Sequence, residues 1–169
     1  MIKDFEDVCD KIKDTLQIEL PALLNAINSE KGVTAPTDPL YLHNPVRYYL
    51  GGKSVDLQLQ EAKPVCVIAP LPTVMEATDI QRGFAHEFES LEVRINARGN
   101  TEETVFRLLM RYGRAVKDVL RRNFHSGFFQ EYEIVKSAEI QRADWDIGKV
   151  GDVFAGVYAV TIRVQLVQI

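Results

Sequence analysis

Residues 88–122 read FESLEVRINARGNTEETVFRLLMRYGRAVKDVLRR, and this stretch decides the fold. Its first part alternates apolar and polar side chains with the period of two that predicts a β-strand. The alternation ends at Arg98-Gly99-Asn100, and apolar residues then recur at intervals of three and four, as in a helix with one buried face. We therefore expect a strand followed by a long helix whose apolar side covers a sheet.

The predicted helix has a second, basic face. Asn100 is the expected N-cap, with Glu103 three residues later as in a capping box. At about 100° per residue, Arg107, Arg111, Arg114 and Arg121 gather opposite the apolar face; we call the first three of them the arginine stripe. Such a stripe suits an acidic partner, either the phosphates of a nucleic acid or the carboxylates of another subunit, and the alternative is a solvated helix face.

The length and the net charge of the chain limit which partners the basic face suits. A chain of 169 residues with 46% hydrophobic residues predicts a single globular domain spanning 1–169. Its formal charge of -4 is unfavourable for a free-standing nucleic-acid binder, whose affinity comes mainly from neutralised phosphates. A basic helix on an acidic chain favours a protein partner, including a second copy of the same chain.

No apolar run is long enough to span a membrane, and residues 1–5 lack the pattern of a signal peptide, so we expect a cytosolic product. Cys9 and Cys66 are expected to be buried free thiols.

The first half of the chain predicts a helical start and a short strand pair. An amphipathic helix begins near Phe5, is either kinked or divided at Pro21, and stops at Gly32. Residues 31–54 predict an irregular segment held to the body by aromatic side chains. Strands are expected at 55–59 and, covered on both faces, at 65–69.

The second half predicts a sheet. Residues 70–83 are expected to form an exposed connection, and the strand at 84–97 changes phase, which predicts a bulge near Glu89-Ser90. After the helix we expect a strand at 128–141, a loop at 143–156 and a long strand from Tyr158 onward, the two strands forming an antiparallel hairpin with an extended tip. This order predicts an α+β fold of two layers, with helices on one face of a mostly antiparallel sheet and a long C-terminal β-hairpin.

Catalytic patterns find little support. His43, His86 and His125 fall in separate elements without metal-ligand spacing. The Gly51-Gly52-Lys53-Ser54 sequence lacks the upstream glycine of a phosphate-binding loop. We expect a protein that is not an enzyme and needs no cofactor or metal, with an enzyme of unrecognised motif as the third hypothesis.

Element order and residues together resemble the tail terminator and tail-completion (head-tail joining) proteins of long-tailed phages. The likeness covers most of the chain except 34–54, and it is carried by the helix reaching Leu20-Pro21-Ala22-Leu23-Leu24, the strand Pro64-Val65-Cys66-Val67-Ile68, the strand at 86–95, the helix at 102–120 and the strand at 158–169. It implies a small α+β virion subunit that forms a ring, expected to be a hexamer, and caps the tail tube. The partners implied are copies of itself, the tail tube protein and the head-tail connector or neck protein, with DNA as passing cargo and no membrane. The expected location is the tail or neck of the virion, after assembly in the bacterial cytoplasm.

A ring needs complementary patches on the two flanks of each subunit. The arginine stripe is expected on one flank, and the acidic complement at Glu87, Glu89 and Glu92, or at Asp144 and Asp146, on the other. The large apolar side chains of the predicted loop, which suit an anchor buried on assembly or else fold back onto the parent sheet, are Trp145, Ile147 and Phe154. Two alternatives stay open: a nucleic-acid-binding module using the arginine face of the helix at 101–122, and another neck or connector ring protein.

Overall fold

A computed structural model describes residues 4–51, 54–72, 74–75, 87–125, 127–129, 131–132 and 135–166. Within these ranges the chain forms two long helices, one short helix and six strands. In chain order the elements are α1 (Phe5–Glu30), β1 (Tyr48–Leu50), α2 (Val55–Leu59), β2 (Cys66–Pro70), β3 (Val74–Met75), β4 (Glu87–Gly99), α3 (Glu102–Asn123), β5 (Val135–Val150) and β6 (Val153–Leu166).

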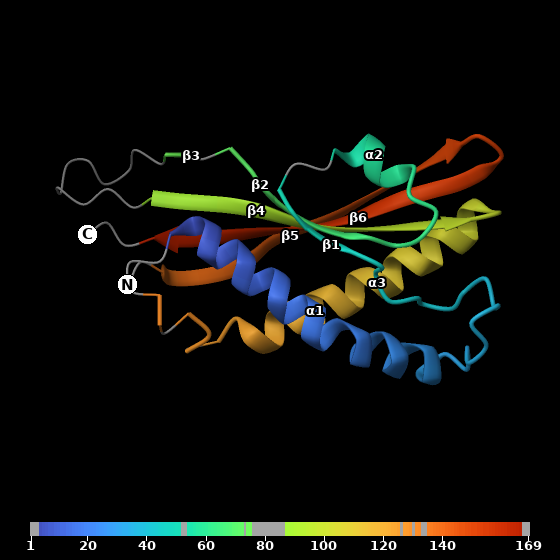
Figure 1. Cartoon of the computed structure of the whole chain (residues 1–169), viewed down its shortest axis with the longest axis horizontal. Helices are drawn as coiled ribbons and strands as arrows, with labels where there is room; N and C mark the ends of the chain where they lie inside the picture. The colour runs from blue at the N-terminus through green and yellow to red at the C-terminus, as the bar shows by residue number, and fades with distance from the viewer. Residues whose placement is uncertain are drawn as a thin grey trace.

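The strands form one sheet in the order β1-β2-β4-β6-β5, and β3 pairs with one end of β4 (Figure 1). Each neighbouring pair is antiparallel except β1 and β2, which run parallel. The short strand β1 and the 16-residue strand β5 therefore lie at the two opposite edges of the described sheet.

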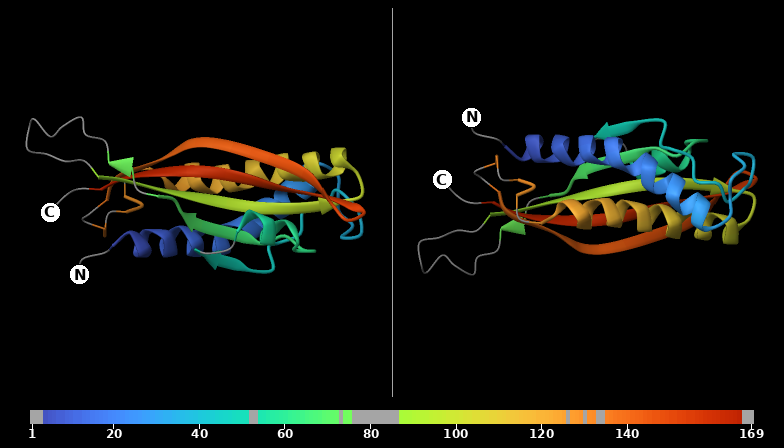
Figure 2. Two further views of the ribbon diagram at one scale, coloured as in Figure 1. Left: turned by 90° about the horizontal axis from the view of Figure 1, so that it is seen from above. Right: turned by 90° about the horizontal axis from the view of Figure 1, so that it is seen from below.

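Helices α1 and α3 lie side by side over one face of the sheet (Figure 2). The side chains of Leu91, Val93 and Ile95 alternate along β4 toward these helices and are fully or almost fully buried. From β6 the same core receives Val160, Ile162 and Val164. The α+β architecture with a mostly antiparallel sheet, two long helices on one face and a long C-terminal hairpin is confirmed.

Helix α3 buries the predicted apolar face but begins one residue later than expected. Thr101, and not Asn100, is the N-cap, because its hydroxyl accepts a hydrogen bond from the backbone N–H of Thr104. Glu103 does not complete a capping box; it forms an ion pair with Arg107 one turn on. The helix then packs closely on the sheet at Gly113.

Helix α1 is a single helix that continues through Pro21, which decides between the two arrangements predicted from the sequence. A capping box of Asp4 and Asp7 closes its N-terminus. The chain leaves the helix at Lys31, followed by Gly32 in the left-handed conformation with φ of 68°. The predicted stop is confirmed.

The irregular segment between α1 and β1 is held by the buried Leu42 and by polar contacts to backbone atoms. The buried Asn28 amide donates to the Leu42 carbonyl and accepts from the Leu42 N–H, at 3.1 and 2.8 Å. Arg111 donates to the Leu40 carbonyl, and the Tyr112 hydroxyl donates to the His43 carbonyl. The predicted irregularity is confirmed up to β1, and the strand β1 itself was not predicted.

The strand predicted at 55–59 is wrong, because these residues form helix α2. Ser54 caps the helix by accepting from the Leu57 N–H, and the buried Gln58 amide donates to the carbonyls of Val65 and Arg94. The helix lies across the sheet from α1 and α3 (Figure 1). The cap by Ser54 and the hydrogen bonds of the buried Gln58 amide favour a helix here, and they outweigh the alternation of only five residues that predicted a strand.

The predicted bulge near Glu89-Ser90 is also wrong. The pairing of β4 with β6 runs without a shift from Glu87 to Gly99. The phase change arises because Phe88 lies on the face opposite to the long helices, where the Arg163 guanidinium stacks 3.7 Å from its ring centroid. Register shifts occur instead in β5, between residues 135 and 137 and between 140 and 142.

The predicted loop at 143–156 is wrong, since β5 and β6 are strands on both sides of a two-residue turn at Gly151-Asp152. Gly151 has φ of 62°, which tight hairpins require and glycine adopts readily. The strand expected at 128–141 begins at Val135, and the aromatic rings of Phe124, Phe128, Phe129 and Tyr132 pack together before it. The predicted connection at 70–83 lies largely outside the described residues.

Candidate subunit interface

The edge strand β5 carries an exposed aromatic pair with helix α3. The rings of Phe106 and Trp145 meet edge to face, with centroids 5.2 Å apart and an interplanar angle of 72°. Phe106 is 39% exposed and Trp145 is 46% exposed, although both are large apolar side chains. We call Phe106 and Trp145 the aromatic knob, and its exposure marks a surface suited to a partner.

Strand alternation separates the other residues predicted around Trp145. Asp144 and Asp146 pair with Ala159 and Val157, so they lie on the face opposite to the long helices. Ile147 lies on the helix side with Trp145. Ile147 and Phe154 are half-buried against the main core, as the alternative of folding back onto the parent sheet expected. Trp145 therefore remains as the exposed anchor of the three.

The arginine stripe makes contacts within the chain. Arg107 pairs with Glu103 at 2.7 Å, and Arg111 donates to the Leu40 carbonyl at 3.1 Å. Arg114 makes two hydrogen bonds of 2.9 Å to the carboxylate of Glu30, the last residue of α1. Arg111 and Arg114 thus fasten α3 to other segments of its own subunit, whereas the pair of Arg107 lies within α3.

The Arg114 pair has an electrostatic reason. Helix α1 carries no basic residue in its last turn, where a helix dipole disfavours a carboxylate such as Glu30. The hydrogen bonds from Arg114, together with the ammonium group of the C-cap residue Lys31, offset this and lower the pKa of Glu30. Both side chains remain about half exposed.

The predicted acidic flank on β4 does not gather on one surface. Glu89 shares the helix side of the sheet with Leu91, whereas Glu92, directly opposite Thr161, lies on the other face. The side chain of Glu87 lies outside the described residues. Glu89 and Glu92 therefore do not share the surface that the sequence predicted for them.

A hollow at the other edge of the sheet was missed in the sequence. It lies where β1 and β2 begin, has a volume of about 360 Å³, and is lined by His43, Asn44, Val46, Ala62, Lys63 and Pro64. Val46 is 53% exposed on its wall. No signal in the sequence places residues 43–46 beside 62–64, because the contact depends on the parallel pairing of β1 with β2. Phe106 could have been found from the sequence, because this aromatic residue lies outside the apolar stripe of α3.

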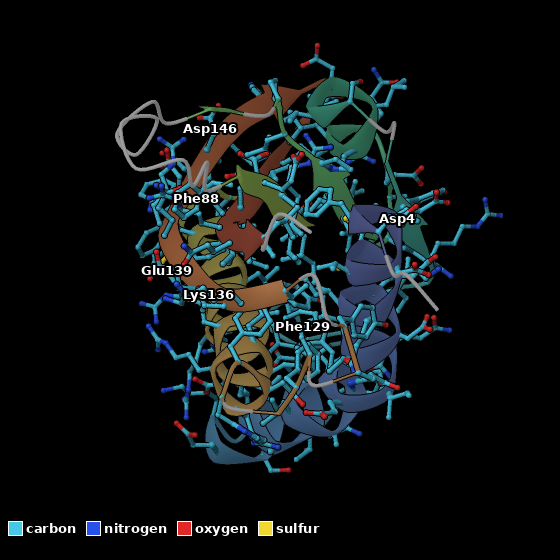
Figure 3. The ribbon with its side chains drawn as sticks, turned by 90° about the vertical axis from the view of Figure 1, so that its left-hand side faces the viewer. Asp4, Phe88, Phe129, Lys136, Glu139 and Asp146 are labelled. Atoms are coloured by element: carbon cyan, nitrogen blue, oxygen red, sulfur yellow. The ribbon has the colours of Figure 1, made fainter. Side chains whose placement is uncertain are left out.

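A larger hollow of about 520 Å³ lies near the start of β5, where its lining includes Phe124, His125, Phe129 and Lys136. Figure 3 looks onto this end of the molecule, with Phe129 between the two long helices and Lys136 and Glu139 on β5.

Burial raises the pKa of both the Cys9 and Cys66 thiols to about 12, so neither is prepared to act as a nucleophile. Within the described part of the chain, no three His, Cys, Asp or Glu side chains are placed to hold a metal ion together.

None of the described helices is both long enough and apolar enough to cross a membrane. In comparisons with known proteins, no family model matches the chain and no curated protein matches it.

Proposed function

We propose that this chain is a structural virion subunit that assembles with copies of itself into a ring, which caps a phage tail tube and meets the neck of the head. The observation that carries this proposal is the aromatic knob at the outer edge of β5. An exposed tryptophan supported by an exposed phenylalanine is the composition expected at the centre of a protein interface.

The edge strand itself supports self-association. Strand β5 has 16 residues and pairs with β6 on one side. Long edge strands offer a row of backbone donors and acceptors to another chain, and proteins usually cover or interrupt them. A neighbouring subunit placed against β5 and the knob covers both features at once.

Burial of the exposed part of Trp145 contributes enough free energy to affect the association of subunits. A tryptophan buries up to about 250 Å², so the exposed 46% of Trp145 corresponds to about 115 Å² of surface. At about 25 cal/mol per Å², its burial contributes about 3 kcal/mol to each contact between subunits. A loss of that size weakens association by about a hundredfold.

The competing nucleic-acid reading has less support. The three arginines on which it depends contact Glu103, Leu40 and Glu30 within the chain. The chain also carries a formal charge of -4. The role at the end of a tail tube and the expected number of six subunits rest on the resemblance of element order to tail terminators. A neighbouring ring of the neck would be built from the same kind of subunit.

Sedimentation velocity over a range of protein and salt concentrations tests the proposal. We expect a discrete larger species that grows at the expense of the monomer as concentration rises. Trp145→Ser is expected to shift this equilibrium toward monomer by about a hundredfold and to leave the circular dichroism spectrum unchanged. Ile18→Ser is the matched control, because Ile18 is an apolar side chain on α1 that is 77% exposed and belongs to neither edge of the sheet.

Two outcomes contradict the proposal. A protein that stays monomeric at every concentration and binds duplex DNA with a steep salt dependence would favour the nucleic-acid module. A Trp145→Ser variant that is unfolded would place Trp145 in the core. The tail role has its own test: substoichiometric protein added to polymerising tail-tube subunits is expected to stop tube growth, and unchanged growth with a bound connector would favour the neck ring.

A further inference from the structure

We infer that the aromatic knob of one subunit enters the hollow at the start of β1 and β2 on the next subunit. The β5 edge of one sheet then contacts the β1 edge of the neighbouring sheet, head to tail. This inference rests on the proposed ring and names the surfaces that build it.

The two features lie at the same height on opposite edges. One row of paired residues crosses the whole sheet, and it consists of Trp145, Tyr158, Ile95, Cys66 and Tyr48. The knob is at one end of this row. Val46, on the wall of the hollow, is two residues before the other end and donates its N–H to the Pro64 carbonyl. A copy placed beside the first at the same height therefore brings knob and hollow together.

The shapes and polarity of the two surfaces match. The knob projects two aromatic rings, and the hollow offers the apolar side chains of Val46, Ala62 and Pro64. Its volume of about 360 Å³ lies at the lower end of the ~300–1,000 Å³ range of pockets that bury small organic groups. A pocket of this size suits an aromatic anchor.

Charge complementarity supports a second copy as the occupant. The residues on both sides of Trp145 in the strand are the exposed carboxylates Asp144 and Asp146. The hollow carries the exposed Lys63, and the exposed Arg47 follows Val46. The nearby opposite charges are Arg107, which is paired with Glu103, and the exposed Arg142 and Lys149 farther along β5. Near the hollow, Glu61 is half-buried. Asp144 and Asp146 lie on the sheet face opposite to the knob, so the β5 edge carries two carboxylates next to Trp145 along the strand, and Lys63 and Arg47 place two cations at the hollow.

The contact is heterologous, because β5 with its knob and β1 with its hollow are different surfaces. Such contacts repeat from subunit to subunit and either close into a ring or continue as a filament. A twofold dimer would need both knob-to-hollow contacts with the same partner at once, and the position of knob and hollow at opposite edges of one sheet does not allow this.

Complementary variants test this arrangement. Trp145→Ser removes the knob and keeps the hollow, whereas Val46→Glu blocks the hollow and keeps the knob. Each purified variant alone is expected to associate at least tenfold more weakly than the wild type. Their equimolar mixture contains one intact knob and one intact hollow, so native mass spectrometry is expected to detect a heterodimer that does not grow further.

Controls separate the possible failures. Ala62→Trp, at an exposed position on the hollow, is a second blocking variant if Val46→Glu does not fold, and Ile18→Glu is an exposed control away from both surfaces. A wild type that assembles while Val46→Glu also assembles, or a mixture without heterodimer, would overturn the docking of knob into hollow and leave the ring proposal standing. A Trp145→Ser variant that assembles like the wild type would contradict both proposals, because both rest on the knob. A wild type that stays monomeric would overturn both.

Discussion

Gly113→Ala in the middle of α3 is expected to destabilise the protein, although the same change stabilises an isolated helix by about 1 kcal/mol. The reason is the ring of Tyr158, which lies against the helix at this point. A Cβ atom at residue 113 would stand 2.5 Å from both Cε atoms of that ring. Ordinary contacts of this kind are roughly 3.5–4.0 Å long, so the ring or the helix must move by about 1 Å.

The size of this loss in stability depends on whether the Tyr158 ring can move away from the added methyl group. Tyr158 is 5% exposed, and the ammonium group of Lys117 lies 5.5 Å from its centroid. Overpacking costs about 1–3 kcal/mol, and a contact short by about 1 Å in a closed site belongs to the upper part of that range, about 2–3 kcal/mol, of which the propensity gain offsets about 1 kcal/mol. We expect a net loss of about 1–2 kcal/mol.

Urea unfolding followed by circular dichroism measures this loss. With a slope of about 2 kcal/mol per M, the midpoint is expected to fall by about 0.5–1 M at unchanged slope. Gly148→Ala is the matched control, because no atom lies within 4 Å of the added Cβ, and its midpoint is expected to stay unchanged. Tyr158→Leu combined with Gly113→Ala is expected to show a smaller penalty for the alanine. A Gly113→Ala variant as stable as the wild type would refute the close packing of α3 on β6.

Two further predictions concern the contacts of α1. Asn28→Ala leaves the buried N–H and carbonyl of Leu42 without their partners, and we expect a loss of about 2–4 kcal/mol in the free energy of unfolding, measured in urea; a loss below about 1 kcal/mol would contradict the pinning role of Asn28. Because Arg114 lowers the pKa of Glu30, the ion pair stabilises the fold above the ordinary carboxyl pKa of about 4.3 and loses this effect as pH falls through the lower folded-state pKa. The melting temperature of the wild type is therefore expected to fall more steeply with acidification than that of Glu30→Gln, and parallel curves would contradict the pair.

The sequence predicted the parts of the fold that follow from long periodic patterns. The apolar stripe of α3 runs from Val105 to Leu120 and the alternation of β6 from Tyr158 to Leu166; the helix and the strand are confirmed, and β6 begins earlier, at Val153. The buried strand between Pro64 and Pro70 was equally clear, and Val65, Cys66, Val67 and Ile68 are fully buried. The stripe and the alternation reflect burial of one side, whereas the continuous apolar run reflects a strand that is covered on both faces.

Short patterns failed where a tertiary contact decided the outcome. The Asp144-Trp145-Asp146-Ile147-Gly148 sequence was interpreted as a loop, yet its alternating polarity is that of an edge strand with one side exposed. Phe88 suggested a bulge because its partner, Arg163, is far away in the sequence. Residues 55–59 alternated like a strand and became a helix because Gln58 finds two buried carbonyls.

The candidate interface was predicted in part. Trp145 was found from its size and its polar neighbours, and its exposure agrees with an anchor. The arginine stripe was a reasonable expectation from one helix alone, but its partners Glu30 and Leu40 belong to the segment around the end of α1. The hollow near Val46 was beyond sequence reasoning, because it is created by the pairing of two short strands.

Electron microscopy of the assembled wild-type protein tests the central claim most directly. Negatively stained particles, sorted into class averages, are expected to be closed rings of equivalent subunits around a central opening, since each subunit offers a knob at one edge and a hollow at the other. Twofold dimers without an opening, or single monomers at the highest concentration, would contradict the proposal that this chain is a ring-forming subunit.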